Sequence, residues 1–289
     1  MPSNSLNHRI LISRTRERVC FKGAVYHVTQ RAPGKERIFL EDRDCLRFLK
    51  ILKESSQKFN FEVYAFALMP NHIHILLSTN DVNLSEAMKN LFERYAIYFN
   101  RKYQRKGHVF YGRFRITLCS DDSYLLSCSV YIHLNPYRAG LCEKPEDYEW
   151  TSARLYMQVL KNSFINADRI LSVLAKDKKE AQQRYLNILL QCLPLNINLN
   201  LDRRFVKDGI AQYNRVVQEC NGRKFEDNEL EKLIEKFKND KYVSDLKDQK
   251  TRQYLVEQLL ANDYSRKEIR EKLGMSKSTL LRVTRNLVK

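Results

Sequence analysis

The apolar positions of this chain recur in two periods, which predict strands and helices in a definite order. Residues 24–31, AVYHVTQR, are rich in β-branched and aromatic residues and predict a strand. Between Glu41 and Phe59 the apolar residues recur at helical spacing. The next two runs, FEVYAFALMP and HIHILLS, resemble strands and are separated by the turn residues Pro70-Asn71, which indicates a hairpin.

The same analysis predicts a second helix, a fourth strand and a third helix. Apolar residues repeat along one face from Leu84 to about Lys102. The strand-like run HVFYGRFRITL is interrupted by Gly112, which indicates a bulge or close approach of another backbone. A third helix begins at Asp121-Asp122 and is expected to end at Pro136. This order predicts the α+β class, with an antiparallel sheet and helices packed on one face.

The remainder of the chain is predicted to be helical. Beyond Trp150 helical patterns dominate, and LPLNINLNL, with its proline and three asparagines, is the best candidate for a linker. We therefore expect a first domain over residues 1–160, a helical extension and linker over 161–200, and a smaller all-helical C-terminal domain over 201–289.

Charge points to a polyanionic partner. The 289 residues include 51 Lys and Arg against 34 Asp and Glu, for a formal net charge of +17. Such a surplus favours nucleic acid, although a solvated basic surface without a partner is the alternative. No apolar run approaches the roughly 20 residues of a membrane span, and the first residues lack the apolar core of a secretory signal, so we expect a cytoplasmic protein. The seven scattered cysteines contain no C-x-x-C pair, which argues against disulfides or a zinc knuckle.

A candidate metal site lies in the second strand of the predicted hairpin. Because side chains alternate along a strand, His72 and His74 share one face and Ile73 lies on the other. Two imidazoles on one rigid surface can hold a cation. A short triplet of this kind also arises by chance, so the alternative is a pair of unrelated polar residues on a half-exposed strand.

The third predicted helix adds a nucleophile and a further ligand. Tyr131 and Asn135 are four residues apart and therefore share a helical face. A protonated phenol is a poor nucleophile because its unperturbed pKa is about 10, so help from a cation is expected. His133 points away from this face and is interpreted as structural. The single His27 of the first strand is interpreted as a packed residue or a neighbour of a ligand rather than a ligand.

Five ordered motifs give this chain a resemblance to a known family. They are YHVTQR, ALMPNHIHILL, GHVFYGRFR, YIHLNPYRAGL and DYEWTSARLY, and together they cover roughly residues 20–157. The chain resembles the single-tyrosine transposases of the histidine-hydrophobic-histidine (HUH) type, in particular the REP-associated tyrosine transposases of bacteria, whose domain is called IS200-like.

The resemblance implies a ferredoxin-like fold, a homodimer, a requirement for Mg²⁺ or Mn²⁺, and binding of single-stranded DNA next to imperfect, REP-like hairpins. By position, His72 and His74 match the metal-binding pair of the family, Tyr131 matches its catalytic tyrosine, and Asn135 matches the third metal ligand. Tyr137 stands where a small aliphatic residue is expected in N-P-x-R-A-G-L, a departure that lies outside the chemistry but could narrow the site.

A basic, aromatic segment at 101–115 is predicted to hold the single strand. Cations follow phosphates and aromatic faces stack on bases. The alternative is that its four rings, Tyr103, Phe110, Tyr111 and Phe114, belong to the core of the sheet. The segment contains no acid and six basic residues, namely Arg101, Lys102, Arg105, Lys106, Arg113 and Arg115.

The C-terminal residues have the pattern of a helix-turn-helix. A turn at Gly274 separates two predicted helices, and Ser276 is expected to cap the second. The pattern resembles the DNA-binding domain of the replication initiator DnaA and implies contact with duplex DNA; a plain helical hairpin is the alternative. The residues expected to meet DNA are Lys277, Ser278, Thr279 and Arg282.

Three functions fit these features. The first is an enzyme that nicks and transfers single-stranded DNA through a covalent 5′-phosphotyrosine at Tyr131, which permits rejoining because the link conserves the energy of the broken bond. The second is a domesticated, catalytically silent DNA-binding regulator. The third is a metal-dependent nuclease that activates water and gives Tyr131 no role.

Overall fold

In a computed structural model of the chain, the described residues are 22–34, 36–119, 121–158, 163–197, 201, 203–221, 256 and 265–285. No helix among them is long and apolar enough to cross a membrane.

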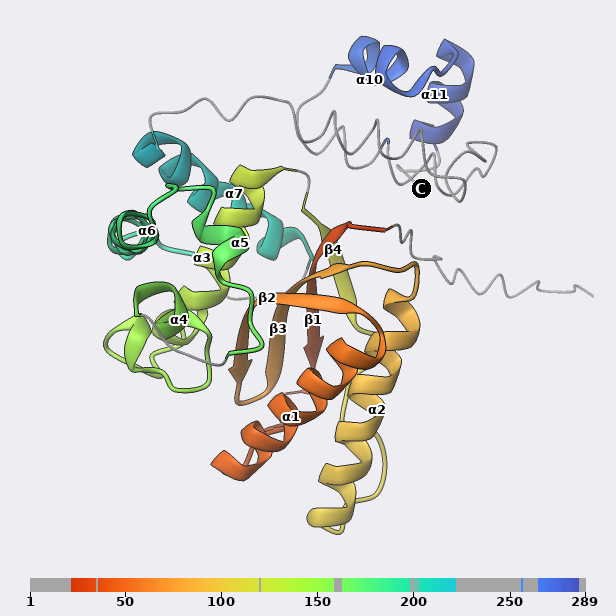
Figure 1. Cartoon of the computed structure of the whole chain (residues 1–289). Helices are drawn as coiled ribbons and strands as arrows, with labels where there is room; N and C mark the ends of the chain where they lie inside the picture. The colour runs from red at the N-terminus through yellow and green to blue at the C-terminus, as the bar shows by residue number, and fades with distance from the viewer. Residues whose placement is uncertain are drawn as a thin grey trace, which may run out of the picture.

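A four-stranded antiparallel sheet forms the centre of the first domain (Figure 1). Its strands are β1 (Val25–Arg31), β2 (Phe61–Met69), β3 (His72–Thr79) and β4 (Arg115–Leu118), in the spatial order β2-β3-β1-β4. A helix follows β1 and another follows β3, and the pairs β1/β3, β1/β4 and β2/β3 are all antiparallel. The predicted α+β class and the ferredoxin-like arrangement are therefore confirmed.

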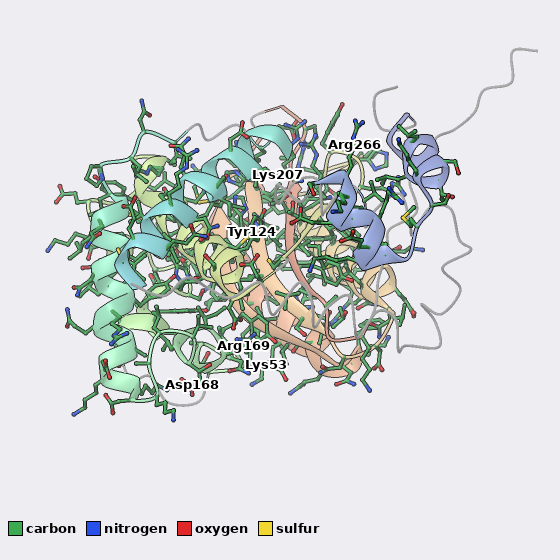
Figure 2. The ribbon with its side chains drawn as sticks, turned by 90° about the horizontal axis from the view of Figure 1, so that it is seen from above. Lys53, Tyr124, Asp168, Arg169, Lys207 and Arg266 are labelled. Carbon is green, nitrogen blue, oxygen red and sulfur yellow. The ribbon has the colours of Figure 1, made fainter. Side chains whose placement is uncertain are left out.

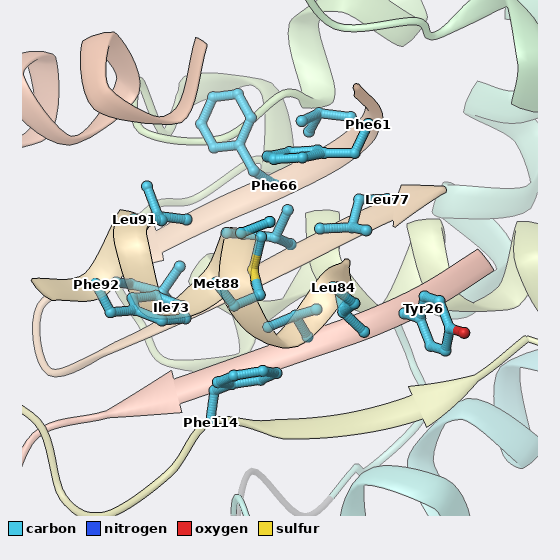
Figure 3. Close-up of a cluster of buried hydrophobic side chains, with 14 of the residues drawn as sticks. Tyr26, Phe61, Phe66, Ile73, Leu77, Leu84, Met88, Leu91, Phe92 and Phe114 are labelled. Atoms are coloured by element: carbon cyan, nitrogen blue, oxygen red, sulfur yellow. The ribbon is translucent and has the colours of Figure 1, made fainter. Parts of the chain in front are cut away.

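Two helices cover one face of this sheet, α1 (Asp42–Lys58) and α2 (Leu84–Lys102). A buried apolar cluster lies between them and the strands, and Figure 3 shows Ile73 of β3 pointing into it beside Met88 and Leu91 of α2. Burial of this apolar surface is the main force that holds the two helices on the sheet.

The opposite face is covered by α3 (Asp122–Arg138), which packs on β2 and β3. The prediction placed helices on one face, which is correct for α1 and α2 but leaves out α3. The third helix also continues past Pro136 to Arg138, so the prediction that it ends at this proline is wrong. Pro136 lies in the last turn, where its missing N–H removes one hydrogen bond, and the helix ends instead before Gly140, whose φ is +67°.

The fourth strand is shorter than its sequence pattern predicted. Only Arg115–Leu118 pair with β1, whereas 108–114 form a loop. Val109 and Phe114 of this loop are buried in the core, but between them Gly112 adopts a left-handed φ of +63°, which breaks the strand.

A layer of further helices lies on the α3 side of the molecule. The longest of them, α7 (Arg203–Asn221), packs directly on α3. Figure 2 shows this layer from above, with Lys207 on α7 and Tyr124 on α3 labelled. Although α7 falls in the predicted C-terminal domain, it packs on the core of the first. The shorter elements before α7 are η1 (Pro145–Asp147), α4 (Ala153–Met157), α5 (Asp168–Leu171) and α6 (Lys178–Cys192).

The C-terminal helices are α10 (Arg266–Leu273) and α11 (Lys277–Arg285). Between them Gly274 has a left-handed φ of +58°, and the Ser276 hydroxyl accepts a hydrogen bond from the Thr279 N–H at 3.1 Å. The predicted turn and cap are therefore present. Six cysteines are described and all are free thiols; the seventh, Cys20, lies outside the described residues.

Candidate active site

The two histidines of the H-x-H triplet lie on the face of β3 that α3 covers. Their cross-strand neighbours on β1 are Arg31, opposite His72, and Thr29, opposite His74. Ile73 points the other way, into the core under α2 (Figure 3). The alternation of the strand therefore separates the polar site from the apolar core, as the sequence predicted.

Helix α3 brings Tyr131 onto these histidines. The ring centroid of Tyr131 lies 5.7 Å from that of His74, and the rings of His72 and His74 are 5.0 Å apart. Asn135, one helical turn beyond Tyr131, lies close enough to influence the pKa of both His72 and Tyr131. Side chains from a strand and a helix that are far apart in the sequence thus meet in one small volume.

His27 adds a third imidazole to the group. Its Nε2 lies 2.9 Å from Nδ1 of His74, and the two rings are stacked with centroids 5.1 Å apart. His27 lies on β1, directly beside β3, and its side chain is 1% exposed. It therefore contacts the H-x-H pair without being part of it. The sequence showed His27 as a single histidine, and only the strand pairing reveals its partner.

Burial holds these imidazoles in the neutral form. It lowers the pKa of His27 to about 3 and that of His72 to about 4, Asn135 acting in the opposite direction at His72. Burial also lowers the pKa of His74, and the neighbouring His72 and His27 lower it further. A neutral imidazole keeps a lone pair on one nitrogen, which is the form that binds a metal ion.

The donor atoms of this group fit a divalent cation. Nε2 of His72 and Nε2 of His74 are both buried and have no hydrogen-bond partner among the described residues. Buried polar atoms without partners are rare in proteins and call for a ligand or water. Among the described residues no three His, Cys, Asp or Glu side chains form a metal cluster. The third ligand predicted from the sequence is the amide of Asn135.

Tyr131 itself is covered by α7. Its side chain is 1% exposed, its hydroxyl has no hydrogen-bond partner among the described residues, and the ring of Tyr213 on α7 lies 6.2 Å away between centroids. Gly209 of α7 is so close that a Cβ there would lie 3.1 Å from Cε2 of Tyr131. Burial raises the pKa of Tyr131 to about 12, against the effect of Asn135. No sequence motif predicted this cover.

Polar contacts fix α7 in place. The Asn214 side-chain oxygen accepts hydrogen bonds from Ser123 and, at 2.9 Å, from Ser127 of α3. Arg138, in the last turn of α3, donates from Nε to the Tyr213 hydroxyl at 3.2 Å. The cover over Tyr131 is therefore tied at both ends of α3.

His133 has a structural role, as the sequence predicted. Its Nδ1 lies 2.7 Å from the Tyr185 hydroxyl and its Nε2 lies 2.7 Å from the Ser152 hydroxyl, so both ring nitrogens are occupied. Burial lowers its pKa to about 3. Its partners come from α6 and from the start of α4, away from the H-x-H pair.

The basic residues of the 101–115 segment do not form one surface. Lys102 pairs with Asp44 at 2.6 Å and with Glu41, and Arg105 pairs with Glu36 at 2.6 Å. Arg101 and Lys106 are exposed. Arg113 and Arg115 lie at the other end, beside β1, where Arg115 Nη1 donates to the carbonyl of Leu201 at 2.7 Å. The structure thus places only the last two beside the strand that carries His27.

The four aromatic rings of the 101–115 segment also lie in different surroundings. Phe114 is buried in the main core, Phe110 packs against that core, and the Tyr103 hydroxyl donates to Asp44 at 2.7 Å. Tyr111 is 59% exposed. Tyr111 is therefore the ring of the four that is available to a ligand.

At the C-terminus, Lys277 and Ser278 are exposed at the start of α11 and Thr279 is half-buried. The Ser278 and Thr279 hydroxyls lie 2.9 Å and 2.8 Å from that of Ser276. Arg282 lies on α11, but its side chain is outside the described residues.

Comparison with known proteins supports the resemblance. Residues 20–135 match a family model described as "Transposase IS200 like". A Haemophilus influenzae protein with the provisional name REP-associated tyrosine transposase is 27% identical over 142 residues, which cover 45% of this chain and 80% of that protein. The resemblance predicted from the motifs is therefore confirmed for the first domain.

Two solved structures are also similar. One, described as a REP-associated tyrosine transposase bound to a REP hairpin, matches with a TM-score of 0.41 and 17% identity over 47% of this chain and 80% of that chain. The other, provisionally described as a transposase from Deinococcus radiodurans R1, has a TM-score of 0.29 and 18% identity over 35% of this chain and 82% of that chain.

Proposed function

We propose that this chain, whose residues 20–135 match the IS200-like transposase family, binds hairpin-flanked single-stranded DNA and cleaves and rejoins it through Tyr131. The observation that carries the proposal is the meeting of Tyr131 with His74 and His72, at 5.7 Å between the ring centroids of Tyr131 and His74, on one buried face of the sheet. The relative named as a REP-associated tyrosine transposase supports a tyrosine as the nucleophile.

His72, His74 and Asn135 would hold the cation, Mg²⁺ or Mn²⁺. A bound divalent cation polarises a phosphate and neutralises the charge that develops on its oxygens. The two imidazoles are kept neutral by burial and offer unpartnered Nε2 atoms. An amide oxygen is a weak neutral ligand, so we expect modest affinity for the metal.

Tyr131 would act as the nucleophile. Its hydroxyl oxygen forms a bond to the scissile phosphorus, the bond from phosphorus to the 3′-oxygen breaks, and the phenol proton goes to solvent while the departing 3′-oxygen takes one up. The products are a 5′-phosphotyrosine and a free 3′-hydroxyl, and attack by a 3′-hydroxyl on the phosphotyrosine reverses the step and joins strands. Because Tyr131 is 1% exposed beneath α7, the phenol must become accessible before it can reach a phosphate.

The test is covalent trapping. Full-length protein is mixed with labelled single-stranded oligonucleotides from the hairpins that flank its gene, with Mg²⁺ or Mn²⁺, and denaturing gels are searched for a protein–DNA adduct. We expect an adduct that Tyr131→Phe abolishes while DNA binding persists. Normal cleavage by Tyr131→Phe would show that the assigned nucleophile is wrong and would favour the enzyme that activates water.

A second function, a catalytically silent DNA-binding regulator, is favoured by one observation. Tyr131 is 1% exposed and α7 is tied over it by hydrogen bonds from α3. In this state the phenol cannot reach a phosphate, whereas the exposed start of α11 could still contact duplex DNA. Hairpin binding with neither adduct nor cleavage under either metal would make this the better description.

We also propose that the protein is a homodimer, because it resembles this family. Light scattering coupled to gel filtration would measure the mass in solution, and a monomer with full cleavage activity would contradict it.

A further inference from the structure

A small pocket opens beside the predicted active site, at the ends of β1 and β4. Its volume is about 150 Å³, well below the roughly 300 Å³ at which typical small-molecule sites begin. A pocket of this size suits one base or one phosphate rather than a whole metabolite. It is lined by Thr29, Gln30, Arg31, Tyr111, Gly112, Arg113, Arg115 and Leu201.

The wall of this pocket is held in shape by hydrogen bonds. The Tyr111 N–H donates to the Arg31 carbonyl at 2.8 Å, and the Gln30 side-chain amide donates to the Gly112 carbonyl at 3.3 Å. The left-handed φ of Gly112, +63°, turns the chain after Tyr111. The loop is further anchored by Phe114, which is buried in the core. The pocket is therefore preorganised for a ligand.

Arginine side chains and an exposed tyrosine ring line this pocket. The guanidinium of Arg31 lies 5.1 Å from the ring centroid of Tyr111, and that ring is 59% exposed. Among the described residues no carboxylate pairs with Arg31 or Arg113, in contrast to Lys102 and Arg105. An aromatic face beside guanidinium groups without a carboxylate is the combination that binds a base together with its phosphate.

The pocket adjoins the predicted metal ligands. Arg31 is the cross-strand partner of His72, and Thr29 is the partner of His74 on one side and of Arg115 on the other. Cross-strand partners project to the same face of a sheet with Cβ atoms about 4.5–5.5 Å apart. Arg31 and Thr29 therefore share the face on which His72, His74 and Tyr131 meet.

We propose that this pocket holds the phosphate of one nucleotide of the single strand, next to the scissile phosphate, on Arg31 and Arg113, while the base of that nucleotide stacks on the exposed ring of Tyr111 at the rim. This subsite rests on the proposed function, since it uses the same DNA strand. It gives Tyr111 and Arg31 a role in choosing where the strand is cut, because a base that stacks on Tyr111 fixes which phosphate faces Tyr131.

The test uses full-length protein with Tyr131→Phe as a background that cannot cleave. Fluorescence anisotropy measures the Kd for a labelled hairpin-flanked oligonucleotide and for a series in which each nucleotide near the cut is made abasic. We expect one abasic position to weaken binding about 5- to 150-fold, the range for base–aromatic stacking. Tyr111→Ala should weaken binding of the intact strand by the same factor. It should not weaken binding of that abasic strand any further, because the stacked base is already absent. Tyr111→Phe should retain affinity.

Arg113→Ala is compared with Arg43→Ala, which removes the same charge from the exposed surface of α1. We expect the larger loss of affinity for Arg113→Ala. The proposed nucleotide subsite would be overturned by equal losses for the two arginine variants, or by a Tyr111→Ala variant whose Kd values match those of the background for every strand. Adduct formation by wild-type protein would still uphold the proposed function in that case. Wild-type protein that neither binds the strand nor forms an adduct would overturn both.

Discussion

His27 and His74 share a buried hydrogen bond, with 2.9 Å between Nε2 of the first and Nδ1 of the second. If His74 uses Nε2 for a metal ion, its Nδ1 must carry the proton and donate a hydrogen bond to Nε2 of His27. This hydrogen bond fixes the tautomer and the orientation of the His74 ring. His27 is then a positioning residue for a predicted ligand. Its pKa, lowered to about 3 by burial, keeps its Nε2 able to accept.

We predict that His27→Ala weakens metal binding about 10- to 100-fold, the usual effect of removing such a partner. Isothermal titration calorimetry with Mn²⁺, on protein without DNA, measures this affinity directly. His27→Gln, whose amide oxygen can accept from His74, should recover most of the affinity. If His27→Ala and His27→Gln bind Mn²⁺ as wild type does, His27 serves packing alone.

A second prediction concerns Asp44, which is fully buried at the start of α1. Its burial would raise its pKa, but hydrogen bonds from Lys102, the Leu40 N–H, Tyr103 and Tyr98 outweigh this and lower it. We expect Asp44→Asn to lower the free energy of unfolding at pH 7 by roughly 2–3 kcal/mol, because buried donors lose a charged acceptor. Urea unfolding measures it.

The exposed Asp42→Asn, two residues away, is the control and should change the free energy of unfolding by less than about 1 kcal/mol. The folded-state pKa of Asp44 is depressed, so its contribution is present above the unfolded pKa of about 3.9 and is lost as pH falls through the folded value. Equal effects of the two variants at pH 7 would contradict the assigned role.

His133 gives a third prediction, on pH. Burial lowers its pKa to about 3, whereas in the unfolded chain it titrates near 6.5. Between these values the unfolded state binds a proton that the folded state does not, so stability falls as pH is lowered from 6.5 towards 3. One such histidine contributes at most about 1.4 kcal/mol per pH unit.

The measurement is urea unfolding at several pH values between 7 and 4 for wild type and His133→Gln. The variant is expected to be less stable overall, because it loses the ring contact with Tyr156, but its stability should depend less steeply on pH. Parallel pH curves for the two proteins would show that His133 does not titrate in this way.

A fourth prediction concerns the cover over Tyr131. A Cβ at Gly209 would lie 2.8 Å from Cγ2 of Ile197 and 3.1 Å from Cε2 of Tyr131, so Gly209→Ala must displace the Ile197 side chain or α7 and disturb the packing over Tyr131. Alanine in place of glycine normally favours a helix by up to about 1 kcal/mol. Here we expect the opposite sign, a loss of roughly 1 kcal/mol in the free energy of unfolding, together with faster nitration of Tyr131 by tetranitromethane, located by mass spectrometry.

Gln218→Ala, at an exposed position of the same helix, is the control and should leave nitration unchanged. Nitration of Tyr131 at the wild-type rate in Gly209→Ala would mean that α7 does not control access to the phenol.

Much of the fold was predictable because local patterns carry it. The period-2 and helical runs placed β1, α1, the β2–β3 hairpin and α2 within a residue or two of their observed bounds. Side-chain alternation likewise placed His72 and His74 on one face, and helical spacing placed Tyr131 and Asn135 together. These features depend on residues that are close in the sequence, so the sequence alone can indicate them.

The tertiary structure decided what depends on contacts between distant segments. It let α3 continue through Pro136, because burial of the helix outweighs one missing hydrogen bond. It paired His27 with His74 across two strands, brought α7 over Tyr131, and sorted four similar rings into three that pack and one, Tyr111, that is exposed. Sequence periodicity determined which face each residue occupies, but which segment covers that face depends on how the whole chain fills space.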